Sequence, residues 1–264
     1  MRKAGITILA IKKANRNSGN TMKSENSSSI KELLRTKDGE NGSYENADLE
    51  NADLKNANLK NANLEGANLK EANLSGANFK GANLKNIEAQ GANLAGATFD
   101  TTNLENADLT HAEISNAVFK KSNLKEAVLR SAEMVNTSLS KCNLKDADLS
   151  YSNLHGAEMK QANLSRMSLM RANLSFADLS DSDLRVANLK DANLSFAKLN
   201  NANLKDANIE GGELINTEIA SADLKNVNLE GANLKEADFT DSNLKGADLK
   251  DSICKGTVFK NATT

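Results

Sequence analysis

Few side chains in the sequence have the chemistry of a catalytic or metal-binding site. The 264 residues include two histidines, His111 and His155, and two cysteines, Cys142 and Cys254, with no CxxC or Cys/His cluster. A zinc site, or a nucleophile with its general base, needs such groups close together. We therefore expect no catalytic residue, no metal ligand and no cofactor. Two isolated cysteines favour a reducing compartment, and hence a cytoplasmic location.

The elements that position these side chains come from an unusual composition. The formal net charge is -2, only 3% of residues are aromatic, and there is no proline or tryptophan. An ordinary core built around large rings is therefore not expected, and a repeat architecture is the first alternative to test. No stretch approaches the roughly 20 apolar residues of a membrane span, so we expect no membrane insertion.

An apolar residue recurs at every fifth position from Leu49 to Phe259. With this position named i, the residue at i-2 is usually alanine, the one at i-1 is usually asparagine or aspartate, and those at i+1 and i+2 are mostly polar. Positions i-2, i-1 and i alternate between inside and outside, which predicts a three-residue strand, and the next two positions then turn a corner. Ten glycines occupy i+2, where a tight turn favours a positive φ: Gly66, Gly76, Gly81, Gly91, Gly96, Gly156, Gly211, Gly231, Gly246 and Gly256.

The rarer core residues indicate how many repeats complete one coil. All phenylalanines at position i are separated by four repeats or by a multiple of four: Phe79, Phe99, Phe119, Phe239 and Phe259. The large side chains at i-2, Ile87, Met167 and Val227, are spaced in the same way. Like side chains stack in a solenoid, so the spacing predicts four repeats, or 20 positions, per coil and about eleven coils. At a strand spacing of about 4.8 Å the rod would be about 50 Å long.

These A-(D/N)-L-x-x units resemble the pentapeptide repeat family over residues 43–262. The resemblance implies an all-β fold, a right-handed quadrilateral β-helix (β-solenoid), for residues 43–264. The segment Leu33-Leu34-Arg35-Thr36-Lys37 is similar to the lead-in of bacterial members, which is often followed by CxxC. Here Gly39 and Gly42 stand at the two cysteine positions, so the resemblance carries no thiol or metal role at this end.

The N-terminal part differs from the repeats in charge and pattern. Residues 1–42 carry a balance of +5, which leaves -7 for the repeats. Residues 1–28 are polar, basic and aperiodic, which predicts a disordered leader, and Met22 is an alternative start. Ser29 to Glu32 match a capping box, so we expect a short capping helix and turn over residues 29–42.

The filled interior of such a coil leaves the outer surface to carry function. His111 at i+2 and His155 at i+1 point outward, whereas Cys142 at i-2 replaces a buried alanine. One column of asparagines is expected to form a hydrogen-bonded ladder, namely Asn63, Asn83, Asn103, Asn123, Asn143 and Asn163. Carboxylates at i-1 form two acidic columns, Asp48, Glu88, Asp108, Asp148 and Asp248 on one wall and Glu158, Asp178, Glu218 and Asp238 on another.

Two further surface features are candidates for binding. A basic stripe runs along i+1 of one wall, interrupted by Glu65 and Glu105: Lys85, Lys125, Lys145, Arg185, Lys205, Lys225 and Lys245. On the opposite wall an apolar patch is predicted around the two phenylalanines at i+2, with the members Val135, His155, Phe176, Phe196 and Ile215. Contiguous exposed apolar surface marks a partner site, although two corner rings could simply shield backbone.

The sequence therefore predicts a non-enzymatic, protein-binding rod that acts as a scaffold or regulator through its convex surface, with an unidentified protein as partner. One alternative comes from the resemblance, because some pentapeptide repeat proteins imitate duplex DNA and protect DNA gyrase from quinolones or toxins. Another is an effector translocated into a second cell, for which the basic leader would act in targeting. Direct nucleic-acid binding is not expected. The last coil exposes strand edges, which predicts a homodimer through this end or a fraying terminus.

Overall fold

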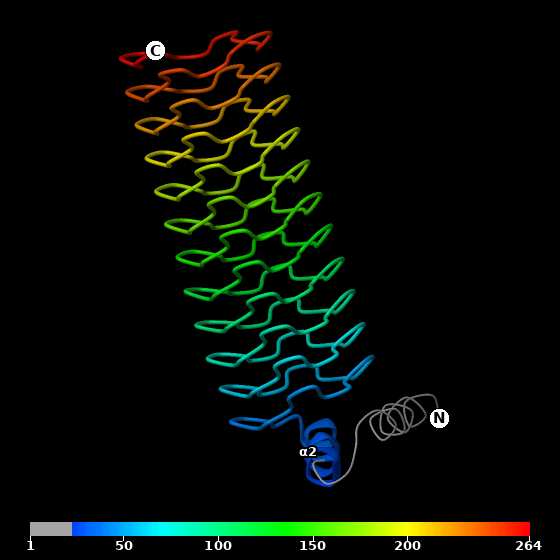
Figure 1. Cartoon of the computed structure of the whole chain (residues 1–264). Helices are drawn as coiled ribbons and strands as arrows, with labels where there is room; N and C mark the ends of the chain where they lie inside the picture. The colour runs from blue at the N-terminus through cyan, green and yellow to red at the C-terminus, as the bar shows by residue number, and fades with distance from the viewer. Residues whose placement is uncertain (1–22) are drawn as a thin grey trace.

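The structure, a computed structural model, describes residues 23–264 as a helix followed by a rod of stacked coils (Figure 1). Helix α2, Lys23–Thr36, stands at one end of the rod, and the chain ends at the other. Most of the predicted leader, residues 1–22, lies outside the described residues. The rest of it, residues 23–28, belongs to α2.

The coils follow the predicted register of four repeats. Every fifth residue from Asp38 to Asn243 forms a parallel bridge with the residue 20 positions later. Two hydrogen bonds hold each bridge; between Asn83 and Asn103, the Asn103 N–H donates to the Ala82 carbonyl at 3.1 Å and the Leu84 N–H donates to the Asn103 carbonyl at 2.7 Å. Each wall has one bridged residue in place of the expected three-residue strand, because the residues on either side of it belong to the corner turns.

Each corner is a tight turn whose third residue has a left-handed backbone. The N–H of Ala52 donates to the carbonyl of Leu49 at 3.0 Å, and the same bond recurs at most other corners. Every residue at position i+2, from Asn41 to Asn261, has a positive φ between 52° and 75°. The ten glycines at this position are thus confirmed as turn residues, but most corners carry a side chain, which costs conformational energy unless the residue is asparagine or aspartate.

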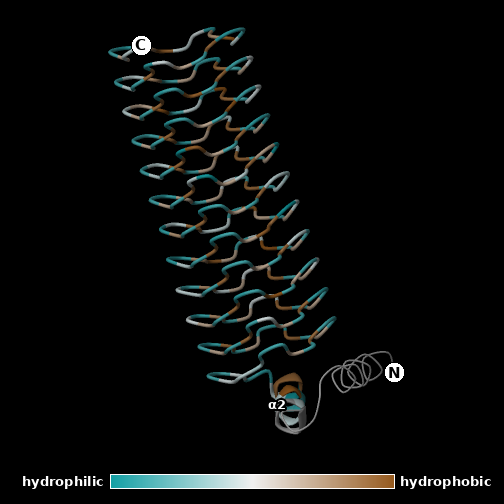
Figure 2. Ribbon diagram, viewed as in Figure 1, coloured by the Kyte–Doolittle hydropathy of each residue, from teal (hydrophilic) through white to brown (hydrophobic). Residues whose placement is uncertain are grey.

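The inward positions fill the rod completely. Leucine, phenylalanine and alanine side chains at i and i-2 are buried from the first coil to the penultimate one, and polar and apolar residues alternate along each coil (Figure 2). The predicted phenylalanine column is confirmed, because the ring centroids of Phe79 and Phe99 lie 4.9 Å apart and those of Phe99 and Phe119 lie 4.3 Å apart. Cys142 is buried, as expected, and its thiol donates to the Phe119 carbonyl.

The asparagine column forms the expected ladder. The side-chain amide of Asn83 donates to the Oδ1 of Asn63 at 3.1 Å, and each later member donates in the same way to the one before it, up to Asn163. Each Oδ1 also accepts the backbone N–H two positions further along the chain, as Asn83 does from Lys85 at 3.3 Å. The ladder therefore fixes both the stacking register and the start of each corner.

Helix α2 covers the first coil. Ile30 and Leu33 are buried against it, and the hydrophobic end of the helix faces the rod (Figure 2). The helix ends where the Lys37 N–H donates to the Leu33 carbonyl at 2.7 Å and Lys37 takes a φ of 59°. The predicted capping box is wrong, since Ser29 lies inside α2. Residues 23–28 contain no proline or glycine, so nothing in their sequence prevents the helix from starting at Lys23.

The first coil begins at Asp38, one repeat before the predicted start at residue 43. Tyr44 occupies position i there and is buried. A Cβ on Gly42 would lie 2.6 Å from the Tyr44 ring, and one on Gly39 would lie 2.7 Å from its hydroxyl oxygen. The two glycines at the places of the expected CxxC therefore make room for this ring.

We predict that Gly42→Ala lowers the free energy of unfolding by about 1–3 kcal/mol, because the added methyl overlaps the Tyr44 ring. Chemical denaturation followed by circular dichroism measures the change. Gly42→Ala should cost less stability when it is made in the Tyr44→Leu variant than when it is made in the parent chain. An unchanged midpoint for Gly42→Ala would show that the ring does not fill this space.

Candidate protein-binding surface

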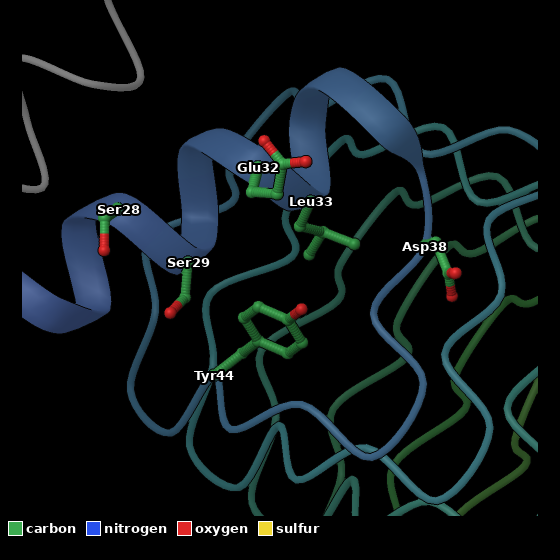
Figure 3. A pocket seen from close by; sticks show the side chains of 6 residues that line it. All are labelled: Ser28, Ser29, Glu32, Leu33, Asp38 and Tyr44. Atoms are coloured by element: carbon green, nitrogen blue, oxygen red, sulfur yellow. The ribbon is translucent and has the colours of Figure 1, made fainter.

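A concavity lies at the helix end of the rod. A pocket of about 470 Å³ lies between α2 and the first coil, lined by Ser28, Ser29, Glu32, Leu33, Asp38 and Tyr44 (Figure 3). Burial, together with the charge of Asp38, raises the pKa of Tyr44, and Glu32 accepts hydrogen bonds from Arg35. Within residues 23–264 no group of three His, Cys, Asp or Glu side chains could hold a metal ion.

The strongest surface feature is the corner patch, which we define as Phe176, Phe196, His155, Val135 and Ile215. The Phe176 and Phe196 rings stack with centroids 4.9 Å apart and planes inclined by 7°. They are 57% and 47% exposed. The structure thus places the two predicted corner rings side by side in adjacent coils.

The histidine extends this stack by one coil. The His155 ring meets Phe176 edge to face with centroids 5.3 Å apart, and its Nδ1 lies 2.9 Å from the Ser175 hydroxyl. Val135 lies one coil before His155, and Ile215 lies one coil after Phe196; both are half-buried. His111, in contrast, stands exposed at another corner, as expected for a surface residue.

Both rings occupy unfavourable backbone positions. Phe176 and Phe196 each have a φ of 61°, a conformation in which bulky residues are outliers and asparagine or glycine is preferred. Their stacking offsets part of this cost, since aromatic pairs contribute about 0.5–1.5 kcal/mol. Backbone strain and exposed apolar area coincide here, a combination that occurs at binding sites.

Two outward columns of the wall that carries the patch are low in charge. Its outward i+1 column has no ionisable group except His155 over eight coils: Ser75, Ala95, Ser115, Val135, His155, Ser175, Ser195 and Ile215. The corner column beside it is equally uncharged: Gly76, Gly96, Asn116, Asn136, Gly156, Phe176, Phe196 and Asn216. The rings therefore lie on a neutral band two columns wide, beside the i-1 column of the same wall, which carries Glu113, Glu133 and Glu213.

The basic stripe lies on the opposite wall and is partly neutralised. Lys85 pairs with Glu105 at 3.5 Å and Lys125 with Glu126 at 2.9 Å. Arg185 pairs with Asp183 at 2.6 Å. The acidic columns show the same pairing, with Asp148 bound by Arg130. The structure therefore distributes both signs along the rod, and neither a cationic nor an anionic face extends over its length.

Three further large side chains are not among the residues predicted from the sequence. Val186 and Tyr151, at i+2 of other corners, are 55% and 50% exposed, and Tyr44 fills the first coil. The five-residue register alone would have placed the first two outside. In the final coil, Cys254 is exposed, as are Ile253, Val258 and Phe259. Pairing of this coil with a second copy stays a prediction.

Comparison with known proteins identifies the family. The model for pentapeptide repeats matches eight copies between residues 47 and 253, so the chain belongs to the pentapeptide repeat family. One similar solved structure is HetL, a pentapeptide repeat protein involved in heterocyst differentiation regulation from the cyanobacterium Nostoc sp. strain PCC 7120. It is 34% identical, with a TM-score of 0.53, over 75% of this chain and 89% of HetL.

Two other solved structures are more distant in shape. QnrB1, a plasmid-mediated fluoroquinolone resistance protein, is 19% identical over 60% of this chain and 84% of QnrB1, with a TM-score of 0.38. Rfr23 from the cyanobacterium Cyanothece 51142 is 32% identical over 46% of this chain and 63% of Rfr23, with a TM-score of 0.22. No curated protein matches the sequence significantly. Among residues 23–264, no helix has the length and apolar character to span a bilayer.

We predict that Val186→Asn raises the free energy of unfolding by about 1 kcal/mol, because it removes a β-branched residue from a left-handed corner with a φ of 60°. The reverse change at an equivalent corner, Asn216→Val, should lower it by a similar amount. Denaturant titration of both variants measures the effect. A loss of stability in Val186→Asn would contradict the proposed corner strain.

The two cysteines should differ sharply in reactivity. Burial raises the pKa of the Cys142 thiol to about 12, whereas Cys254 is exposed. At pH 8 the native protein should therefore take up one equivalent of a maleimide, at Cys254, and a second only after unfolding. Peptide mapping by mass spectrometry identifies the labelled thiol. Rapid labelling of Cys142 in the native protein would contradict the filled interior.

Proposed function

We propose that this chain is a non-enzymatic rod that binds another protein through its convex surface and acts as a scaffold or regulator. The observation that carries the proposal is the stacked, half-exposed pair Phe176 and Phe196. Exposed aromatic anchors dominate the energetics of protein interfaces. Here they stand where both solvation and backbone preference oppose them, so folding alone does not account for their presence.

Further features support this proposal. The interior is filled by leucine, phenylalanine and alanine side chains, which leaves the outer faces for recognition. HetL, at 34% identity, is a protein involved in regulating differentiation, which favours a regulatory role. Two free cysteines, one of them exposed, favour a reducing compartment such as the cytoplasm. We also infer a right-handed coil, the hand of nearly all crossovers between parallel strands.

The charge pattern favours a protein partner over imitation of duplex DNA. A mimic of DNA needs a continuous anionic face, whereas Lys160 pairs with Asp178 at 2.9 Å and Lys190 pairs with Glu210 at 2.7 Å. The corner patch, in contrast, is apolar and lies on a neutral band. Recognition by shape and apolar contact fits this surface better than recognition by charge alone.

A pull-down from the cells that express the protein tests the proposal. We expect the parent chain to retain a specific partner that the double variant Phe176→Ser, Phe196→Ser loses, with the bound proteins identified by mass spectrometry. Val186→Ser is the matched control, because it removes an exposed apolar side chain from an equivalent corner on another wall. This control should retain the partner.

Two results would contradict the proposal. Equal retention of every partner by the double variant would remove the corner patch as the site. Retention of DNA gyrase by all variants, together with an effect on its supercoiling activity with or without a quinolone, would support the DNA mimic instead.

A further inference from the structure

Carboxylates surround the corner patch at both of its ends. Glu133 and Glu158 lie in the two coils before Phe176, while Glu213 and Glu218 lie in the coil after Phe196. All four are exposed. Their hydrogen-bond partners are neutral: Glu133 accepts from the Asn153 amide at 2.9 Å, Glu213 from Asn233 at 2.8 Å and Glu218 from Asn200 at 3.1 Å. Glu158 accepts from the Ser138 hydroxyl at 3.5 Å.

Several other carboxylates on the rod differ from these four in their ion pairing. Within the part of the chain that the structure describes, none of the four forms a salt bridge, whereas Glu88, Glu105 and Glu126 each do. Asp178, beside Phe176, is neutralised by Lys160 at 2.9 Å, and Lys198 adds one positive charge in the same column. The carboxylates around the rings therefore outnumber these two lysines, and the rim of the patch carries a net negative charge.

Asp178 remains ionised near neutral pH. Its burial opposes ionisation, but hydrogen bonds from Lys160 and Ser180 and the Lys160 charge outweigh burial and lower the pKa of this carboxyl. Asp178 and Lys160 therefore form an ion pair at the edge of the patch. A neutral aromatic centre with an anionic rim is complementary to an apolar side chain flanked by cations.

The coil spacing sets the dimensions of such a ligand. Glu158 and Glu218 stand in one column and are separated by three coil steps, through Asp178 and Lys198. At about 4.8 Å per step, this corresponds to about 14 Å along the rod. An extended peptide advances about 3.4 Å per residue, so residues four apart span the same length and point to the same face.

We propose that the corner patch binds an extended segment of a partner protein with the pattern Lys/Arg-x-apolar-x-Lys/Arg. The central apolar side chain packs on Phe176 and Phe196, and the two cations meet the carboxylates at either end of the patch. This inference rests on the proposed protein-binding function and specifies the chemistry of its partner. It also assigns a role to Glu158 and Glu218, which the fold does not require.

A displayed library of random 12-residue peptides tests the inference. The library is selected on the full-length chain, with counter-selection on Phe176→Ser, Phe196→Ser so that only patch-dependent peptides survive. We expect enrichment of the five-residue pattern above. Binding of a synthetic enriched peptide should weaken about tenfold or more in Glu158→Gln, Glu218→Gln. It should also weaken as the salt concentration rises.

The control and the other outcomes separate the two proposals. Glu71→Gln, Asp206→Asn removes two exposed carboxylates from corners other than that of the rings and should leave peptide affinity unchanged. Patch-dependent peptides that lack cations, or that bind Glu158→Gln, Glu218→Gln equally well, would overturn the charged motif and leave the protein-binding function standing. A selection that yields no patch-dependent peptide would overturn both.

Discussion

The rest of the structure depends on one constraint, which is that every fifth residue adopts a left-handed backbone. This residue turns the chain through each corner, so that four corners close one coil and bring equivalent positions into register. The backbone groups then pair between coils, and the side chains at i and i-2 meet in the interior. Asparagine, aspartate and glycine satisfy the corner at low cost, which explains their frequency there.

The interior positions of such a rod accept few residue types, whereas the outward positions accept many. Each interior position contacts its equivalent in the neighbouring coils, so the core accepts leucine, phenylalanine and alanine but no functional group that needs solvent. The outward positions carry no such requirement. A bulky side chain at a corner is therefore informative, because neither packing nor backbone preference selects it. Phe176 and Phe196 are two such residues in adjacent coils, and the neutral band and carboxylate rim around them form a coherent recognition surface.

Much of the fold was predictable from the sequence because the repeat is strictly periodic. The spacing of Phe79, Phe99 and Phe119 indicated the coil length, and the register then placed Phe176 and Phe196 on one corner. The asparagine ladder followed from the same register. The start of the rod was not predictable in this way, because Gly39 and Tyr44 stand where leucine is usual. Only the three-dimensional contact between the glycines and the ring explains that substitution.

The start of α2 and the pairing of surface charges also required the structure. The capping pattern at Ser29 suggested a helix start that the chain does not use, since local hydrogen-bonding preference is weak against a continuous helical segment. The rim around the corner patch depends on which carboxylates find a cation. That outcome follows from side-chain reach between coils, as for Lys160 and Asp178, and not from the order of residues alone.

The unfolding free energy of Phe176→Asn, Phe196→Asn compared with the parent chain tests the central claim most directly. The account predicts a value that is unchanged or higher by up to about 1 kcal/mol, because asparagine suits the left-handed corner and the lost ring stacking is modest. A decrease of more than about 2 kcal/mol would contradict it. Such a loss would show that the two rings protect the backbone of the rod and are retained for stability.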